Sequence, residues 1–355
     1  MHTAFIPPEP SAVLLQMPKC NIHTHLEGSV RAETYLELAA RHKVPLPFEH
    51  SEIEEKIRVD GSEKTLVEYL DKIRVNYAIL NNKDALFRTA YEAAEDAYRD
   101  GVIYLELRDG PALHCGSGLP VEACIESMLA GLQEAEMKFG IVCRLIVAGL
   151  RDHNPQTNVE LAQAAGRLMN QGVVGFDLAG DEASYPASLH REAIETAREM
   201  GLSLTVHAGE AAGADNVRYA VEELSAKRIG HGVRSSESPE VMELLRDRQV
   251  LLEICPTSNV HTGTVPSIEA HPLKTLHDYG IPISINDDDP ITSRTRVSNE
   301  LMLLQTVFKM PLETLLEIQL TTLDHSFLRE ESVRAGLKSR VREFALNQSI
   351  TPEGF

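Results

Sequence analysis

Short apolar runs rich in β-branched residues recur along the chain, and most are followed by a longer segment with helical periodicity. Eight such runs are candidate strands, at residues 20–25, 102–107, 143–147, 173–178, 203–207, 228–231, 250–254 and 282–286. Candidate helices lie between them, at residues 84–99, 121–139, 158–171, 188–200, 216–225, 237–248 and 272–279. Strands and helices that alternate eight times are typical of a parallel (β/α)8 barrel. We therefore expect an α/β fold, a TIM-like barrel that forms one domain over residues 1–355.

The segment between the first two candidate strands, about residues 29–101, is too long for an ordinary connection and predicts a helical insertion. Within it, four apolar residues recur at the spacing of one helix face, and these are Leu66, Tyr69, Leu70 and Ile73. This face could pack against the core, or it could form a hydrophobic lid over a site at the strand ends. A helical extension is expected after the eighth strand.

The charge balance of the chain limits its partners. There are 34 Lys and Arg residues against 53 Asp and Glu, a formal charge of −19, which repels nucleic acid backbones and anionic lipid surfaces. No apolar run approaches the roughly 20 residues that span a bilayer, and residues 1–10 lack the pattern of a signal peptide. Five cysteines without a Cys-x-x-Cys pair fit a reduced compartment. A cytoplasmic protein is expected, and its oligomeric state is not predicted.

Two histidines with one residue between them, His23 and His25, end the first candidate strand. A strand places residues i and i+2 on one face, so the two imidazoles converge. Imidazole is the commonest protein ligand for zinc-like metals, and the pair could supply two ligands of a metal site. Many such pairs are ordinary surface residues, so the pair alone is a weak signal.

Further polar groups follow three later candidate strands. HAGE at 207–210 follows the fifth strand, His231 between two glycines follows the sixth, and NDDDP at 286–290 follows the eighth. Taken singly, Glu210 could be a first-turn helix residue, His231 a turn residue and the aspartates a solvated acidic run. The carboxyl ends of parallel barrel strands form one face, where residues from distant positions meet. The joint pattern therefore favours one shared site.

Six ordered motifs resemble the adenosine/adenine deaminase family of the amidohydrolase superfamily, and bacterial adenosine deaminases most of all. They are HTHLEG at 23–28, FDLAGDE at 176–182, HAGE at 207–210, GHG at 230–232, CPTSN at 255–259 and NDDDP at 286–290. The resemblance covers nearly the whole chain. It implies a (β/α)8 barrel, one zinc ion per chain, and hydrolytic removal of the 6-amino group of a purine.

The resemblance also assigns roles to residues. The zinc ligands would be His23, His25, His207 and Asp288, with a water completing the shell. Three imidazoles and one carboxylate are ligands that zinc accepts, and an open position distinguishes a catalytic site from a structural one. Glu210 would donate a proton to N1 of the purine. His231 and Asp288 would orient the attacking water and help move its proton.

A substrate pocket follows from the same resemblance. Its residues would be His25, Glu27, Gly180 and Asp289, together with the candidate lid residues Leu66, Tyr69, Leu70 and Ile73. The backbone N–H of Gly180 would meet N3 of the purine, and Asp289 would bond N7. The chain has no Pro-Cys-x-x-Cys partner for a His-x-Glu motif, which excludes the cytidine-type zinc deaminases. Asp177 ends the fourth strand without a lysine, so a lysine-bridged two-metal site fits poorly.

Some residues depart from the adenosine-specific pattern. Glu27 stands where adenosine deaminases commonly carry an Asp that reaches the ribose 5′-hydroxyl, and where adenine deaminases often carry Glu. Asp287 replaces a more usual Thr or Ser, and Tyr69 and Ile73 replace aromatic gate residues. In contrast, TSNVHTG at 257–263 is closer to the bacterial adenosine-type motif.

We therefore expect a zinc-dependent hydrolase that converts adenosine or 2′-deoxyadenosine to inosine or deoxyinosine plus ammonia. Adenine, or an N6-substituted or otherwise modified adenosine, is the alternative substrate. A nucleoside-binding protein that kept the fold and lost the chemistry is a different possibility, although retention of Glu210 argues against it. A zinc hydrolase of an amide or phosphoester would leave Gly180 and Asp289 without a role.

Overall fold

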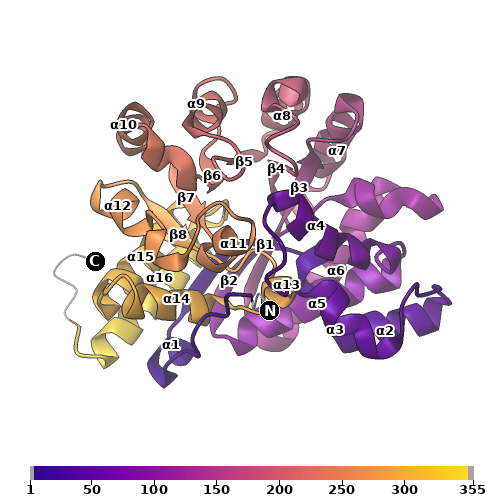
Figure 1. Ribbon diagram of the computed structural model, residues 1–355, viewed down its shortest axis with the longest axis horizontal. Coiled ribbons are helices and arrows are strands. Elements are labelled where there is room, and N and C mark those ends of the chain that lie inside the picture. Colours follow the sequence, from indigo (N-terminus) through magenta and orange to yellow (C-terminus); the bar gives the residue numbers. More distant parts are fainter. Residues whose placement is uncertain (1–3, 351–355) are drawn as a thin grey trace.

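The computed structural model describes residues 4–350 and confirms the predicted (β/α)8 architecture. Eight parallel strands pair in chain order, so that each neighbours the next in sequence. The strands are β1 (Lys19–His25), β2 (Val102–Asp109), β3 (Val142–Leu150), β4 (Val173–Ala179), β5 (Ser203–Ala208), β6 (Arg228–His231), β7 (Leu251–Ile254) and β8 (Ile283–Ile285). Figure 1 shows these strands at the centre, with helices around them.

The barrel closes between the end of β8 and β1. Thr24 and Asp288 form an isolated parallel bridge. The backbone N–H of His25 donates to the carbonyl of Asp288 at 2.7 Å, and the N–H of Asp288 donates to the carbonyl of His23 at 3.0 Å. Barrel closure therefore brings the candidate ligands of β1 and Asp288 together by backbone hydrogen bonds.

The helices that alternate with the strands match the predicted ones, with small shifts at their ends. They are α5 (Lys83–Arg99), α6 (Val121–Phe139), α7 (Pro155–Arg167), α8 (Arg191–Glu199), α9 (Ala214–Glu222), α10 (Pro239–Asp247) and α12 (Leu273–Asp278). The helix α7 begins earlier than expected because Asn154 caps it and Pro155 occupies its first position. Two predicted helices start or end as short 3-10 turns, namely η5 (Met169–Gln171) and η6 (Ala187–His190).

The insertion after β1 and the extension after β8 are helical, as expected. The insertion contains η1 (Glu27–Ser29), α2 (Ala32–His42), η2 (His50–Glu52), α3 (Ile53–Ile57), α4 (Leu66–Arg74) and η3 (Val75–Ala78). The extension contains α13 (Pro290–Ser293), α14 (Val297–Thr306), α15 (Leu312–His325) and α16 (Glu331–Asn347). The other elements are α1 (Ala12–Gln16), η4 (Pro111–Ser117), η7 (Val233–Glu237), α11 (Pro256–His261) and η8 (Ile268–Ala270). Among residues 4–350, none of the helices combines the length and apolar character that a bilayer span requires.

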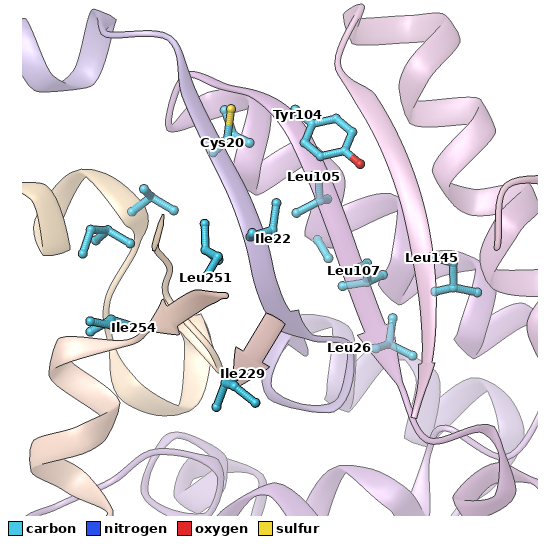
Figure 2. Close-up of a cluster of buried hydrophobic side chains, with 14 of the residues drawn as sticks. Cys20, Ile22, Leu26, Tyr104, Leu105, Leu107, Leu145, Ile229, Leu251 and Ile254 are labelled. Carbon is cyan, nitrogen blue, oxygen red and sulfur yellow. The ribbon is translucent and has the colours of Figure 1, made fainter. Parts of the chain in front are cut away.

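The strands separate an apolar layer from a polar barrel interior. Arg108 of β2 contacts Asp177 of β4 and Glu253 of β7. These strands are not neighbours, so the three side chains meet across the interior of the barrel. Because side chains alternate along a strand, Ile22 and Leu107 point to the outer face, where helices cover them. Figure 2 shows both residues within this buried cluster.

Candidate functional site

Histidines from three strands meet at the carboxyl end of the barrel. The coordinating atoms of His23, His25 and His207 all lie within 4.8 Å of one another, and His23, His231 and Asp288 form a second such group. One oxygen of Asp288, Oδ1, lies 3.3 Å from Nε2 of both His23 and His25. The structure therefore brings together all four residues expected to bind a metal, together with His231.

Buried carboxylates orient two of these imidazoles. Nδ1 of His23 lies 2.8 Å from Oε2 of Glu253, and Nδ1 of His207 lies 2.9 Å from Oδ2 of Asp177. Because each Nδ1 faces a carboxylate, Nε2 is left to face the centre of the site. Nε2 of His23 is buried and has no hydrogen-bond partner. This carboxylate–histidine arrangement is the one that orients metal-binding imidazoles, so the donor set fits a metal ion.

Arg108 connects the two orienting carboxylates. Its Nη1 bonds Asp177 at 2.9 Å and its Nη2 bonds Glu253 at 2.8 Å, and all three side chains are fully buried. Burial raises the pKa of Glu253, but the positive charges of Arg108 and Arg228 outweigh this effect and hold the pKa well below its usual value. Loss of one partner would leave an uncompensated buried charge, which costs about 3–5 kcal/mol.

Glu210 lies in a loop that a second glutamate holds in place. The carboxylate of Glu182 accepts backbone N–H bonds from four consecutive residues, 209–212, at 2.8–3.0 Å. The next helix begins only at Ala214, so Glu210 is not a first-turn helix residue. Burial, followed by the negative charge of Asp288, raises the pKa of Glu210 well above its usual value. These surroundings therefore favour the protonated form of Glu210.

His231 and Asp288 adopt a backbone conformation that side chains rarely take. Their φ angles are 60° and 59°. Such residues cluster at functional sites, because strain persists only where the surroundings enforce it. The side-chain amide of Asn259 donates to Nδ1 of His231 at 3.1 Å, which leaves the ring proton on Nε2. That atom lies 3.6 Å from Oε2 of Glu210 and 3.9 Å from Oδ2 of Asp288.

One cavity joins the candidate metal ligands to the predicted substrate residues. Of the predicted site residues, only the fully buried His23 is missing from its lining. The others that line it are His25, Glu27, Leu66, Tyr69, Leu70, Ile73, Gly180, His207, Glu210, His231, Asp288 and Asp289. The φ angle of Gly180 is +97°, a conformation that favours glycine. The apolar face of α4 lines this cavity and also packs in a small cluster with Val59. This position fits packing against neighbouring side chains as well as a lid over the cavity, so the lid remains a prediction.

Asp289 is fixed by its neighbours and keeps one free oxygen. Its Oδ2 accepts a 3.0 Å bond from the hydroxyl of Tyr69, whereas its buried Oδ1 has no partner. A Cβ atom at Gly28 would lie 1.9 Å from Oδ1, so only glycine fits there. Burial, followed by the charge of Asp288, raises the pKa of Asp289 well above its usual value. Tyr69 thus positions Asp289, a role that the sequence did not reveal.

Asp287 lies outside this cavity. Its Oδ1 accepts a 2.7 Å bond from the side-chain amide of Asn21, and both residues line a different cavity beside α5. The replacement of Thr or Ser by Asp287 therefore alters the junction of β8 and β1 rather than the pocket that holds Glu210.

The sequence is similar to a known protein family and to curated relatives. The sequence model described as "Adenosine deaminase" matches residues 18–344. A protein of Clostridium botulinum named adenosine deaminase is 35% identical over 330 residues, which cover 92% of this chain and 98% of the relative. A protein of the same name from Clostridium acetobutylicum is 33% identical over 319 residues, which cover 90% of this chain and 95% of the relative.

Solved structures share the fold over nearly the full length. An adenine deaminase from Arthrobacter aurescens is 28% identical with a TM-score of 0.86, covering 93% of this chain and 99% of the other. An amidohydrolase from Burkhoderia ambifaria with bound Zn is 27% identical with a TM-score of 0.88, covering 98% and 97%. The N6-methyl-AMP deaminase from Arabidopsis thaliana is 25% identical with a TM-score of 0.83, covering 94% and 99%.

Proposed function

This chain belongs to the adenosine deaminase family of C–N hydrolases, and from that premise we propose that it removes the 6-amino group of adenosine or 2′-deoxyadenosine. One observation carries the proposal. Three of the four residues of a donor set that fits a metal ion line the same cavity as the buried acid Glu210 and the imidazole of His231. In the reaction, water adds its oxygen to C6, the bond between C6 and the amino nitrogen breaks, and ammonia leaves.

The proposed cofactor is one zinc ion per chain. Its ligands would be His23, His25, His207 and Asp288. The mixture of imidazole nitrogen and carboxylate oxygen suits zinc, and a related amidohydrolase structure contains Zn. When bound, zinc supplies a Lewis acid that makes water a nucleophile at neutral pH. His231 and Asp288 would orient that water, because both residues line the cavity and Nε2 of His231 lies 3.9 Å from Oδ2 of Asp288.

Two protonated carboxyl groups would hold the purine ring. N1 and N7 of adenine are hydrogen-bond acceptors, so a carboxyl group can bond them only when it carries a proton. The raised pKa values of Glu210 and Asp289 supply that form. Glu210 would donate its proton to N1 as water adds to C6, whereas the free Oδ1 of Asp289 would bond N7. The backbone N–H of Gly180, at the cavity wall, would meet N3.

The charge of the cavity favours a nucleoside over a nucleotide. One related structure is an Arabidopsis protein in complex with GMP, and a second related structure contains IMP. In this chain, Arg74 is the only lysine or arginine among the described residues that line the cavity. The Arg74 side chain is 44% exposed and paired with Asp71. Asp152 and Asp181 line the cavity as well, so a phosphate group would meet more negative than positive charge.

A substrate panel tests this proposal directly. Adenosine, 2′-deoxyadenosine, adenine, N6-methyladenosine and AMP would each be followed by ultraviolet absorbance at equal enzyme concentration. We expect adenosine or 2′-deoxyadenosine to give the highest kcat/KM, and AMP to be lower by at least about 100-fold, or ~2.7 kcal/mol. Adenine at least about tenfold better than adenosine would make the protein an adenine deaminase. No turnover with tight inosine binding would indicate a nucleoside-binding protein.

Glu27 is the residue on which the nucleoside and free-base readings differ. Burial, followed by the negative charge of Asp109, raises the pKa of Glu27 to about 8, so its carboxyl group is mainly neutral at pH 7. If this group contacts the sugar, Glu27→Ala should lower kcat/KM for adenosine by about 0.5–1.5 kcal/mol, because one hydrogen bond is lost. The same change should affect adenine much less, since adenine has no sugar. The measurement is kcat/KM for both substrates in both proteins. An equal loss for both substrates would show that Glu27 does not read the sugar.

A further inference from the structure

A row of three hydrogen-bonded side chains, His271, Asn259 and His231, leads from the start of α12 to the cavity. The backbone N–H of Leu273 donates to Nδ1 of His271 at 3.0 Å. Nε2 of His271 lies 3.2 Å from Oδ1 of Asn259, and Nδ2 of Asn259 lies 3.1 Å from Nδ1 of His231. All three side chains are buried, and only His231 of the three lines the cavity. The row therefore connects the cavity to a helix that does not line it.

The first donor of this row fixes the direction of every bond that follows. A backbone N–H can only donate, so Nδ1 of His271 accepts from Leu273 and carries no proton. Burial lowers the pKa of His271 to about 3, so the ring is neutral near pH 7 and its single proton is on Nε2. That proton is donated to Oδ1 of Asn259, and the amide nitrogen of Asn259 then faces His231. Because an amide nitrogen can only donate, Nδ1 of His231 accepts.

Asn259, in the middle of the row, is fixed in place and in orientation. Its backbone N–H donates to the carbonyl of Cys255 at 2.9 Å, and its carbonyl accepts from the N–H of Val265 at 3.0 Å. If the side-chain amide were turned by half a rotation, its NH2 group would face the Nε2–H of His271, donor against donor. A buried donor without an acceptor costs about 1–3 kcal/mol, so this orientation is strongly disfavoured.

The last member of the row, His231, consequently holds its ring proton on Nε2. Which ring nitrogen of a neutral imidazole carries the proton is set by the hydrogen bond that the other nitrogen makes. Nε2 lies 3.6 Å from Oε2 of Glu210 and 3.9 Å from Oδ2 of Asp288, where the attacking water of the proposed reaction would lie. An N–H donor there binds one lone pair of the water oxygen and leaves another to meet C6. With the proton on Nδ1, Nε2 would instead accept a hydrogen from the water and turn it.

We propose that His271 is a positioning residue for the deamination, which acts through Asn259 to keep the ring proton of His231 on Nε2. This inference rests on the proposed function, because it concerns the group that orients the attacking water. The competing role for His271 is structural, since its bond from Leu273 satisfies one free N–H in the first turn of α12. The two roles use different ring nitrogens. Positioning of His231 needs the Nε2 donor, whereas capping of α12 needs only the Nδ1 acceptor.

Two substitutions of His271 separate these roles, because each keeps one of the two nitrogen positions. His271→Gln places an amide nitrogen near the position of Nε2 and keeps a donor toward Asn259. His271→Asn places an amide oxygen near the position of Nδ1 and keeps an acceptor for Leu273, but its shorter side chain ends before the position of Nε2. We expect His271→Gln to keep kcat for adenosine within threefold of wild type. His271→Asn should lower kcat at least tenfold and leave KM within threefold.

The control for the exchange itself is His325→Asn, at the end of α15 and outside the cavity lining. Its kcat should equal that of wild type. A structural role predicts the opposite order, with the greater loss in His271→Gln. That order, or equal losses in the two His271 variants, would overturn the inference.

The position of the ring proton in His231 gives a second measurement, which does not depend on turnover. Long-range ¹H–¹⁵N NMR correlations of protein labelled at its histidine ring nitrogens show which nitrogen carries the proton, and His231→Gln identifies the signal. We expect the Nε2–H form alone in wild type and in His271→Gln, and a mixture of both forms in His271→Asn.

Asn259→Asp is an independent variant and replaces His271→Asn if that protein does not fold. Both of its side-chain oxygens accept, so the proton of His231 should move to Nδ1 and kcat should fall at least tenfold. An Nε2–H signal that stays unchanged in His271→Asn and in Asn259→Asp would overturn the inference. If wild type deaminates none of the purines in the panel, the proposed function fails, and the NMR signals alone decide whether His271 controls His231.

Discussion

Replacing Glu210 with glutamine is expected to lower kcat for adenosine at least ~100-fold, while zinc content and substrate binding stay close to wild type. The amide has nearly the same shape but cannot give a proton to N1 of the purine. Glu182 holds the loop through backbone N–H groups of residues 209–212, so the substitution leaves those bonds intact. The measurements are kcat, KM and the metal content of the purified variant.

A matched variant controls for the Glu-to-Gln exchange itself at a position outside the site. Glu222→Gln makes the same chemical change on the exposed side of α9, and Glu222 lies outside the cavity. Its turnover should equal that of wild type. Near-normal turnover in Glu210→Gln would show that the proton reaches N1 from another group. A loss of zinc together with activity would show that Glu210 supports the metal site instead.

The fold could be predicted because its signals are local. Each strand of the barrel is an apolar run bounded by polar or glycine residues, and each long helix repeats its apolar positions every three to four residues. The short elements α11 and α13 were not predicted, since four to six residues carry too little periodicity. Both helices begin at a proline: Pro256 lies two positions after the end of β7, and Pro290 directly follows the aspartates after β8.

The residues that face the cavity could be predicted for a related reason. Barrel topology sends the carboxyl end of every strand to one face, so His23, His207 and His231 had to lie near one another once the strands were known. The exact pairing of Asp288 with β1 could not be predicted. It depends on the backbone bonds that close the barrel, between residues more than 260 positions apart.

The residues that support the site were missed. Glu253 is the one charged residue of β7, and Arg108 is one of three charged residues in β2; charged residues inside buried strands are the signal that could have revealed them. Their pairing depends on which positions of β2 and β7 point inward, and at what height in the barrel. Glu182 follows the predicted Gly180 by only two positions, but its role arises from a loop conformation around residues 209–212 that local sequence does not specify.

Removal of the metal is expected to abolish deamination, and added zinc should restore it, because Glu210 and His231 alone do not make water a nucleophile. Metal analysis should find about one zinc per active chain. His23→Ala should lose bound zinc, since it removes a ligand whose orientation Glu253 fixes at 2.8 Å. His325→Gln, at the end of α15 and outside the cavity lining, should keep it. Two metal ions per active chain, or full activity in a verified metal-free preparation, would contradict this expectation.

Thermal unfolding gives a second measurement of the metal that does not depend on turnover. A ligand that binds only the folded protein stabilises it by RT ln(1 + [L]/Kd), about 4 kcal/mol at a free concentration 1,000 times the Kd. Chelation should therefore lower Tm in wild type and in Glu210→Gln, but not in His23→Ala, which already lacks the ion. Glu210→Gln would be inactive with a zinc-dependent Tm, and His23→Ala inactive without one. This pattern assigns proton transfer and metal binding to separate residues within one cavity, whereas an equal Tm response in both variants would show that the two roles had been assigned incorrectly.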